Sequence, residues 1–218
     1  MNESIKAKLI SLIAEKCGVV NRIDSSHCKT SHLISGKAKQ DIKVYAGIND
    51  IIKTVAFLYM QEAIPILEQS LIDSNACFNL PIVKLALARF GNKKFETDII
   101  DTLKPDFSKD GYEWVDDFRL KGGFLSFINS QESVSQLSNW LDLTKTYDYA
   151  ADRMKGKSAY LIVGYIREII LNKEFHDIIN GKDLTGLEIS DNKLINQCKN
   201  WMIRNKGKYQ LNKGYYIY

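Results

Sequence analysis

Proline and histidine are scarce in the 218-residue sequence, with three of each, and its four cysteines lack CxxC spacing. The sequence therefore offers few residues for nucleophile–base catalysis, and it contains no GxSxG, HExxH or glycine-rich dinucleotide-binding motif. The scattered cysteines indicate neither a disulfide framework nor a zinc site. The most apolar run, at 159–166, is far below the roughly 20 residues of a membrane span. With no signal-peptide pattern at the N-terminus, these absences predict a soluble cytoplasmic protein, not an enzyme, without cofactor or metal.

The net charge is only +4, but its distribution along the chain is uneven. Residues 1–47 contain 8 Lys/Arg and 4 Asp/Glu, residues 48–145 contain 10 and 14, and residues 146–218 contain 12 and 8. The middle of the chain is therefore acidic and lies between two basic flanks. An acidic face attracts a basic protein and repels nucleic acid. We therefore expect the partner to be another protein, with nucleic acid as the alternative and no membrane contact.

Apolar residues recur at helical spacing through most of the chain, and the alternation typical of strands is scarce. Pro81 lies just inside an apolar segment at 80–90, and Gly91 lies just beyond it, which predicts where this helix begins and ends. Its apolar residues are so numerous that it should be covered on several sides. Residues 18–40 are polar and without a stable period, which predicts a long loop.

A weak internal repeat accompanies this periodicity. Pairs of apolar residues recur at offsets of 32, 38 and 38 residues: Leu67 and Leu71, Ile99 and Leu103, Leu137 and Leu141, Phe175 and Ile179. Between them lie candidate second helices, at 80–90, 112–128, 147–171 and 191–204. Gly122-Gly123 is predicted to break or kink the second of these. Such a period is typical of antiparallel helix pairs joined by variable loops.

The stretch 61–103 resembles a HEAT repeat, with AIPILEQSL as an opening helix and IVKLALARFG as a buried, alanine-rich second helix. The ending WMIRNKGKYQL is similar to tails that follow short bacterial HEAT arrays. The resemblance implies an all-α fold of antiparallel helix pairs, stacked as a short HEAT-like α-α superhelix that binds proteins or, in some cases, nucleic acid. We expect a single structural domain made of an N-terminal helix and irregular arm (1–47), a helical repeat domain (48–204) and a basic aromatic tail (205–218).

Two short motifs have ligand-binding chemistry but poor context. ADRMKGKS at 151–158 fits the loosest form of a phosphate-binding loop, yet no buried strand precedes it and Asp152 would repel a phosphate. We interpret it as a basic turn between helices. His27, Cys28 and His32 are ligand-type residues, but adjacent ligands strain the tetrahedral geometry that zinc favours. We interpret this segment as a polar loop.

The preferred functional candidate is the segment YEWVDDFR at 112–119, where carboxylates alternate with aromatic rings. Val115 and Phe118 are expected to face the core, and the acidic residues to face solvent. Aromatic groups beside carboxylates favour contact with a basic protein. The candidate partner-binding residues are Tyr112, Glu113, Trp114, Asp116, Asp117, Tyr147, Tyr149, Asp152 and Arg153. An alternative interpretation, in which Trp114, Tyr147 and Tyr149 are ordinary core or rim aromatics, stays open.

These features support two main hypotheses. The first is an immunity or inhibitor protein that neutralises a bacterial toxin, such as a basic nuclease, by covering its active site. The overall pI of about 8.7 argues against this hypothesis, whereas the acidic middle of the chain supports it. The second is a nucleic-acid-binding protein or an enzyme resembling HEAT-like DNA glycosylases, using Lys84, Arg89, Arg119, Arg153, Lys155 and Arg167. Cations and rings from Trp201 to Tyr216 suit nucleic acid, but we favour the interpretation as a basic helix end with a frayed tail. A scaffold in a larger assembly is a third option.

Overall fold

The computed structural model describes residues 3–20, 49–72, 80–109, 111–142, 146–149, 154–179 and 192–213. These ranges are helical apart from short loops and one hairpin, which confirms the predicted all-α class. The chain divides into two compact units, Met1–Glu96 and Thr97–Tyr218. The division falls inside one helix of the segment predicted as a continuous repeat domain. The superhelical stacking itself stays a prediction.

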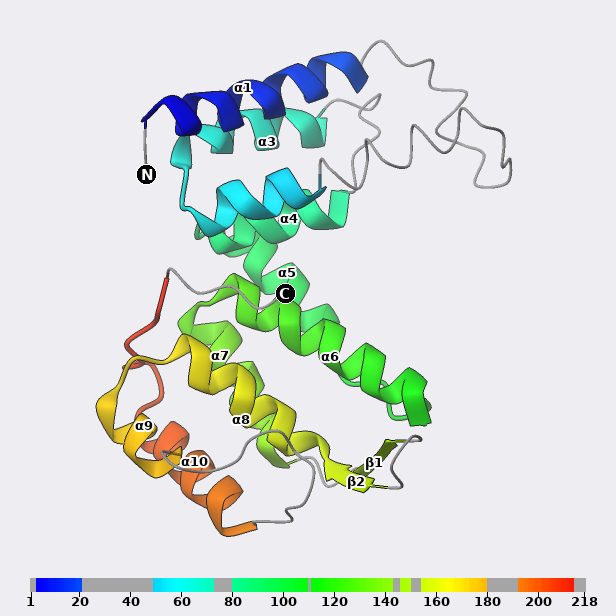
Figure 1. Ribbon diagram of the computed structural model, residues 1–218, viewed down its shortest axis with the longest axis vertical. Helices are drawn as coiled ribbons and strands as arrows, with labels where there is room; N and C mark the ends of the chain where they lie inside the picture. Colours follow the sequence, from blue (N-terminus) through cyan, green and yellow to red (C-terminus); the bar gives the residue numbers. More distant parts are fainter. Residues whose placement is uncertain are drawn as a thin grey trace. The chain divides into compact units, whose positions relative to one another are not determined.

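The described part of the first unit is helical. Its helices are α1 (Glu3–Val20), a helix over 49–57, η2 (Gln61–Ala63), α3 (Ile64–Ile72), α4 (Leu80–Arg89) and the start of α5 (Lys93–Thr102). α1 lies alongside α3, and α3 packs on α4 (Figure 1). As predicted, α4 is covered on most sides, because six apolar side chains from Ile82 to Ala88 are buried in it. The predicted N-terminal helix is α1, and the predicted arm lies almost wholly outside the described residues.

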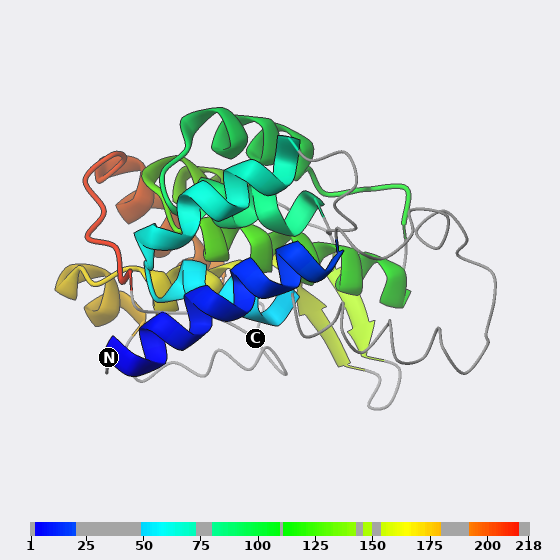
Figure 2. The ribbon, with the colours of Figure 1, turned by 90° about the horizontal axis from the view of Figure 1, so that it is seen from above.

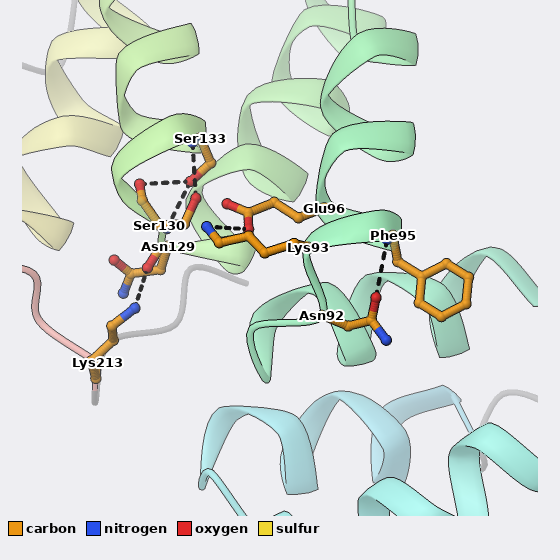
Figure 3. Close-up of polar contacts among 8 residues, drawn as sticks. All are labelled: Asn92, Lys93, Phe95, Glu96, Asn129, Ser130, Ser133 and Lys213. Carbon is orange, nitrogen blue, oxygen red and sulfur yellow. Dashed lines mark hydrogen bonds and ion pairs between the residues drawn. The ribbon is translucent and has the colours of Figure 1, made fainter. Parts of the chain in front are cut away.

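The turn between α4 and α5 follows the helix-ending rules that the sequence indicated. Gly91 has a φ of +97°, a left-handed conformation that glycine adopts without steric cost. Asn92 then caps α5, because its Oδ1 accepts a hydrogen bond from the backbone N–H of Phe95 at 3.3 Å (Figure 3). The boundaries of both helices are therefore encoded locally.

The second unit is a bundle of helices around a single apolar core. Its elements are α6 (Gly111–Ile128), α7 (Gln131–Asn139), η3 (Trp140–Asp142), β1 (Thr146–Tyr149), β2 (Met154–Lys157), α8 (Ser158–Ile169), α9 (Lys173–Ile179) and α10 (Asn192–Arg204). α6, α7 and α8 pack on one another, and α10 packs on α7, α8 and α9. The three tryptophans of the sequence, Trp114, Trp140 and Trp201, all lie in this core.

The predicted break at Gly122-Gly123 is wrong, because α6 runs without interruption from Gly111 to Ile128. A Cβ atom at Gly122 would lie 2.7 Å from Cε2 of Tyr165 on α8. The tyrosine hydroxyl donates a hydrogen bond to the carbonyl of Arg119, at 3.1 Å. The glycine therefore allows α6 and the Tyr165 ring to approach closely, and it is not a breaker.

The predicted helix over 147–171 is wrong in its first part. β1 and β2 form an antiparallel hairpin with Thr146 opposite Lys157 and Tyr149 opposite Met154 (Figure 2), and α8 begins only at Ser158. Threonine and tyrosine favour extended backbone, which suits β1. The predicted basic turn at 151–158 is therefore wrong for 154–157, which form a strand; 151–153 lie outside the described residues.

The predicted frayed tail is wrong as far as Lys213. Tyr209 is buried, and its hydroxyl donates a hydrogen bond to the carbonyl of Met202 at 2.9 Å. The side chain of Gln131 pairs with both the N–H and the carbonyl of Tyr209. Lys213 Nζ reaches the carbonyl of Asn129 at 2.5 Å (Figure 3). The segment thus continues the fold after α10; residues 214–218 lie outside the described residues.

Candidate partner-binding surface

One face of α6 combines exposed carboxylates with an exposed leucine. Glu113 and Asp116 are exposed, and Leu120, with 57% of its surface exposed, follows at the same helical phase. We call these three residues the α6 stripe. The opposite side of α6 carries Val115 and Phe118, which are buried as predicted. Among the described residues no ion pair to Glu113 or Asp116 is recorded. The stripe therefore presents negative charge on the N-terminal side of an apolar side chain.

Trp114 does not belong to this surface. Its side chain is 1% exposed and its ring stacks on Phe118 with centroids 5.3 Å apart. Phe118 in turn contacts Trp140 at 5.2 Å, so these rings form part of the core. The interpretation of Trp114 as an exposed anchor is wrong, and the alternative of a core aromatic is confirmed for this residue.

Asp117 is largely engaged within the protein. Its carboxylate contacts Lys109 Nζ at 2.8 Å and Lys121 Nζ at 2.7 Å. Burial alone would raise the pKa of Asp117, but hydrogen bonds from these two lysines hold that pKa below its usual value. The carboxylate is thus charged and already neutralised by its neighbours. Its role is to tie other segments to α6 more than to offer a free charge to a partner.

The segments that Asp117 ties down belong to the loop between α5 and α6. Lys109 comes from the end of this loop, and Lys121 Nζ also donates to the carbonyl of Lys104 at its start, at 2.7 Å. Asp106 accepts hydrogen bonds from both the backbone N–H and the hydroxyl of Ser108, which lower the pKa of Asp106. Within this loop Phe107 is 58% exposed.

Phe107 and Leu120 are not among the partner-binding residues predicted from the sequence. A local pattern was present for each. Phe107 lies in PDFSK, where the Asp and Ser favour a tight turn that displays the residue between them. Leu120 lies out of phase with the buried residues Trp114 and Phe118 on α6.

The other candidate residues are only partly described. β1, which carries the backbone of Tyr147 and Tyr149, packs beside α6, so the structure brings these two positions near the predicted segment. Their side chains, and that of Tyr112, are outside the described part of the chain. Asp152 and Arg153 lie outside the described residues altogether.

Several groups proposed for nucleic-acid binding are buried. Arg89 is 2% exposed; its Nε donates to the carbonyl of Ala56 at 3.1 Å, and its guanidinium lies over the rings of Phe57 and Tyr59. It stabilises the packing of α4 and is not accessible to a ligand. Trp201 and Tyr209 are also buried, so neither ring can stack on an unpaired base. Lys84, Arg119 and Arg167 are exposed; Arg153 and the side chain of Lys155 are not described.

The described residues offer little for metal or nucleophilic chemistry. Over these ranges no group of three or more His, Cys, Asp and Glu is placed to hold a metal ion, while His27, Cys28 and His32 lie outside them. Burial raises the pKa of the Cys198 thiol to about 12, so this thiol stays protonated at neutral pH. His176 Nε2 lies 2.6 Å from the carbonyl of Ile170 in a local packing contact. None of the described helices has the length and apolarity to cross a bilayer.

No protein-family model, curated protein or solved structure matches this chain. Function is therefore argued from the chemistry of the surface itself.

Proposed function

We propose that this chain is a non-enzymatic binding protein that inhibits a basic protein partner, in the manner of an immunity protein that covers the active site of a bacterial toxin. The observation that carries the proposal is the α6 stripe, in which Glu113 and Asp116 precede the exposed Leu120 on one face of the helix. An interface that combines a buried apolar centre with complementary charge is typical of specific protein complexes.

The charges and the leucine have different roles in this proposal. Exposed carboxylates attract a basic partner over about one Debye length, roughly 8–10 Å, and so increase the rate of association. Leu120 supplies binding free energy once the complex forms, because full burial of a leucine side chain is worth about 1.5–3 kcal/mol. The net charge of +4 weakens this attraction, but the local field at the docking face contributes most to steering.

Co-expression with the product of the neighbouring gene tests the proposal. We expect a stoichiometric complex and protection of the host cells from that product. The Glu113→Lys/Asp116→Lys variant should bind at least tenfold more weakly, mainly through slower association at low salt. The matched control is Asp98→Lys/Asp101→Lys, which reverses two exposed carboxylates of the same spacing on α5 and should change the affinity much less.

Two results would contradict the proposal. One is the absence of a complex and of protection with the wild-type chain. The other is a complex that Glu113→Lys/Asp116→Lys leaves unchanged. Recovery of nucleic acid that dissociates steeply as salt is raised would support the nucleic-acid hypothesis instead.

A further inference from the structure

The loop between α5 and α6 displays an aromatic side chain that contacts α6 at Trp114, the residue after Glu113. Phe107 is 58% exposed, although its ring contacts that of the buried Trp114, with centroids 5.4 Å apart. The Trp114 ring stacks on Phe118, and the Phe118 ring contacts Trp140, at similar centroid distances. One side of the Phe107 ring is therefore supported by a stack of core aromatics, and the remainder faces solvent.

We infer that Phe107 is the aromatic anchor of the partner-binding surface and that Asp117 is a positioning residue that holds Phe107 in place. The partner is a basic protein that has an apolar site beside lysine or arginine side chains. This inference rests on the proposed function and specifies how the partner is recognised. It extends the surface from the α6 stripe to the preceding loop.

The positioning role follows from how the loop is fastened. Lys109, at the end of the loop, pairs with Asp117 Oδ1 at 2.8 Å. Lys121, one helical turn beyond Asp117, pairs with its Oδ2 at 2.7 Å and donates to the carbonyl of Lys104 at the start of the loop. One carboxylate thus connects both ends of the segment that carries Phe107. A side chain held in this way loses less conformational entropy on binding, which increases its contribution to affinity.

The charge pattern selects the chemistry of the partner. Lys109 and Lys121 are engaged by Asp117, whereas the carboxylates of Glu113 and Asp116 are exposed, with no ion pair recorded to them in the described ranges. Because the Phe107 ring contacts Trp114, which follows Glu113 on α6, a partner that covers Phe107 also reaches the start of the α6 stripe. Lysine or arginine around an apolar pocket is the complement of such a surface, since aromatic anchors in desolvated pockets dominate many interfaces.

The test uses the full chain and its co-expressed neighbouring gene product, with the dissociation constant measured by calorimetry. Phe107→Ala should raise the dissociation constant at least tenfold. The matched control is Ile203→Ala, which removes an apolar side chain of similar exposure (60%) on α10 and should change the constant less than about twofold. Thermal unfolding of each variant establishes that the fold is retained.

A double-mutant cycle separates positioning from general structural support. Asp117→Asn should weaken binding about threefold to tenfold in the wild-type background, because the loop is released. It should have almost no effect in the Phe107→Ala background, where no anchor remains to be positioned. Lys109→Gln removes the same tie at a more exposed position and should show the same coupling, which keeps the test decisive if Asp117→Asn does not fold.

Each result bears on the inference. Unchanged affinity of Phe107→Ala in a complex that Glu113→Lys/Asp116→Lys disrupts would overturn the anchor and leave the proposed function standing. No complex with the wild-type chain would overturn both. Equal weakening by Asp117→Asn with and without Phe107 would assign it general structural support and overturn its positioning role. Self-association of the free chain that Phe107→Ala abolishes would assign the surface to a second copy, against the inference.

Discussion

At the residue scale, Gly122 and Gly123 are adjacent in α6 but have different surroundings. A Cβ atom built on Gly122 lies 2.7 Å from a ring carbon of Tyr165, whereas nothing lies within 4 Å of one built on Gly123. The Tyr165 hydroxyl is fixed by its hydrogen bond to the Arg119 carbonyl. The ring therefore cannot move away without the loss of this bond. Alanine substitution of the two glycines therefore distinguishes the effect of helix propensity, which both share, from overpacking between helices, which only Gly122 shows.

We expect Gly122→Ala to lower the free energy of unfolding by about 1–2 kcal/mol, because overpacking outweighs the gain of roughly 1 kcal/mol that alanine brings to a helix. Gly123→Ala should raise it by about 0.5–1 kcal/mol through helix propensity alone. Urea denaturation followed by tryptophan fluorescence measures both. Equal effects of the two substitutions would contradict the role of Tyr165.

The sequence could predict part of this residue-level picture. The glycine pair indicates low helix propensity at this point of the sequence. It does not indicate the close approach of Tyr165, which is more than 40 positions away and has a ring carbon 2.7 Å from the Cβ position of Gly122. The core position of Trp114 was open to prediction, since it shares a helical phase with Phe118 four residues later. The PDFSK pattern could have indicated the turn that displays Phe107, but it does not encode the ion pair between Lys109 and Asp117 that fastens the loop to α6.

At the element scale, the segment after α10 is joined to several other elements. The backbone N–H of Leu171 donates to the carbonyl of Gln210 at 2.7 Å, and that of Asn212 to the carbonyl of Ile169 at 2.7 Å. These bonds flank the bridge between Ile170 and Leu211. The segment therefore pairs with the turn between α8 and α9 as an irregular strand would, and it covers the end of the core through Tyr209.

A chain that ends at Lys208 should be less stable by about 3–5 kcal/mol, the range found when a large buried aromatic is removed. The Tyr209 ring lies 6.2 Å from that of Trp201, so the truncation should also shift tryptophan emission toward that of exposed indole. The matched control ends at Lys213 and should retain wild-type stability in the same urea titration. Equal stability of the two truncations would contradict a structural role for 209–213.

Element boundaries were predictable where short-range chemistry sets them. Pro81 marks the start of α4, and Gly91 and Asn92 define the α4–α5 turn, through rules that act over a few residues. The β1–β2 hairpin was missed because its strands are only four residues each, too short for a two-residue period to stand out. The packing of the last segment was missed because its partners, such as Gln131, are distant in sequence.

At the scale of the whole molecule, the chain forms two compact units, Met1–Glu96 and Thr97–Tyr218, where the sequence predicted one domain with a repeat region at 48–204. No proline, glycine or polar run marks the division, because it falls inside α5 (Lys93–Thr102). A helix shared by two units keeps its own periodicity throughout. Composition and periodicity therefore give no sign of the boundary.

The second unit should fold independently when it keeps the whole of α5. Its core extends from Leu103 to Tyr209 and, within the part of the chain that the structure describes, includes no residue of the first unit. A fragment that begins at Asn92 also retains the cap of α5, in which Asn92 Oδ1 accepts from the Phe95 N–H. We expect this fragment to unfold cooperatively in urea with the buried-tryptophan emission of the full chain, since all three tryptophans belong to the second unit.

The matched control begins at Asp98 and so removes the first turns of α5 and their cap. It should unfold at a lower urea concentration, because an uncapped, shortened helix holds its own residues Ile99 and Ile100 less firmly against the core. Exposed-tryptophan emission or a non-cooperative transition for the Asn92 fragment would mean that the core of the second unit depends on the first. In that case the division after Glu96 would reflect only the distribution of contacts, and the whole chain would unfold as one cooperative unit.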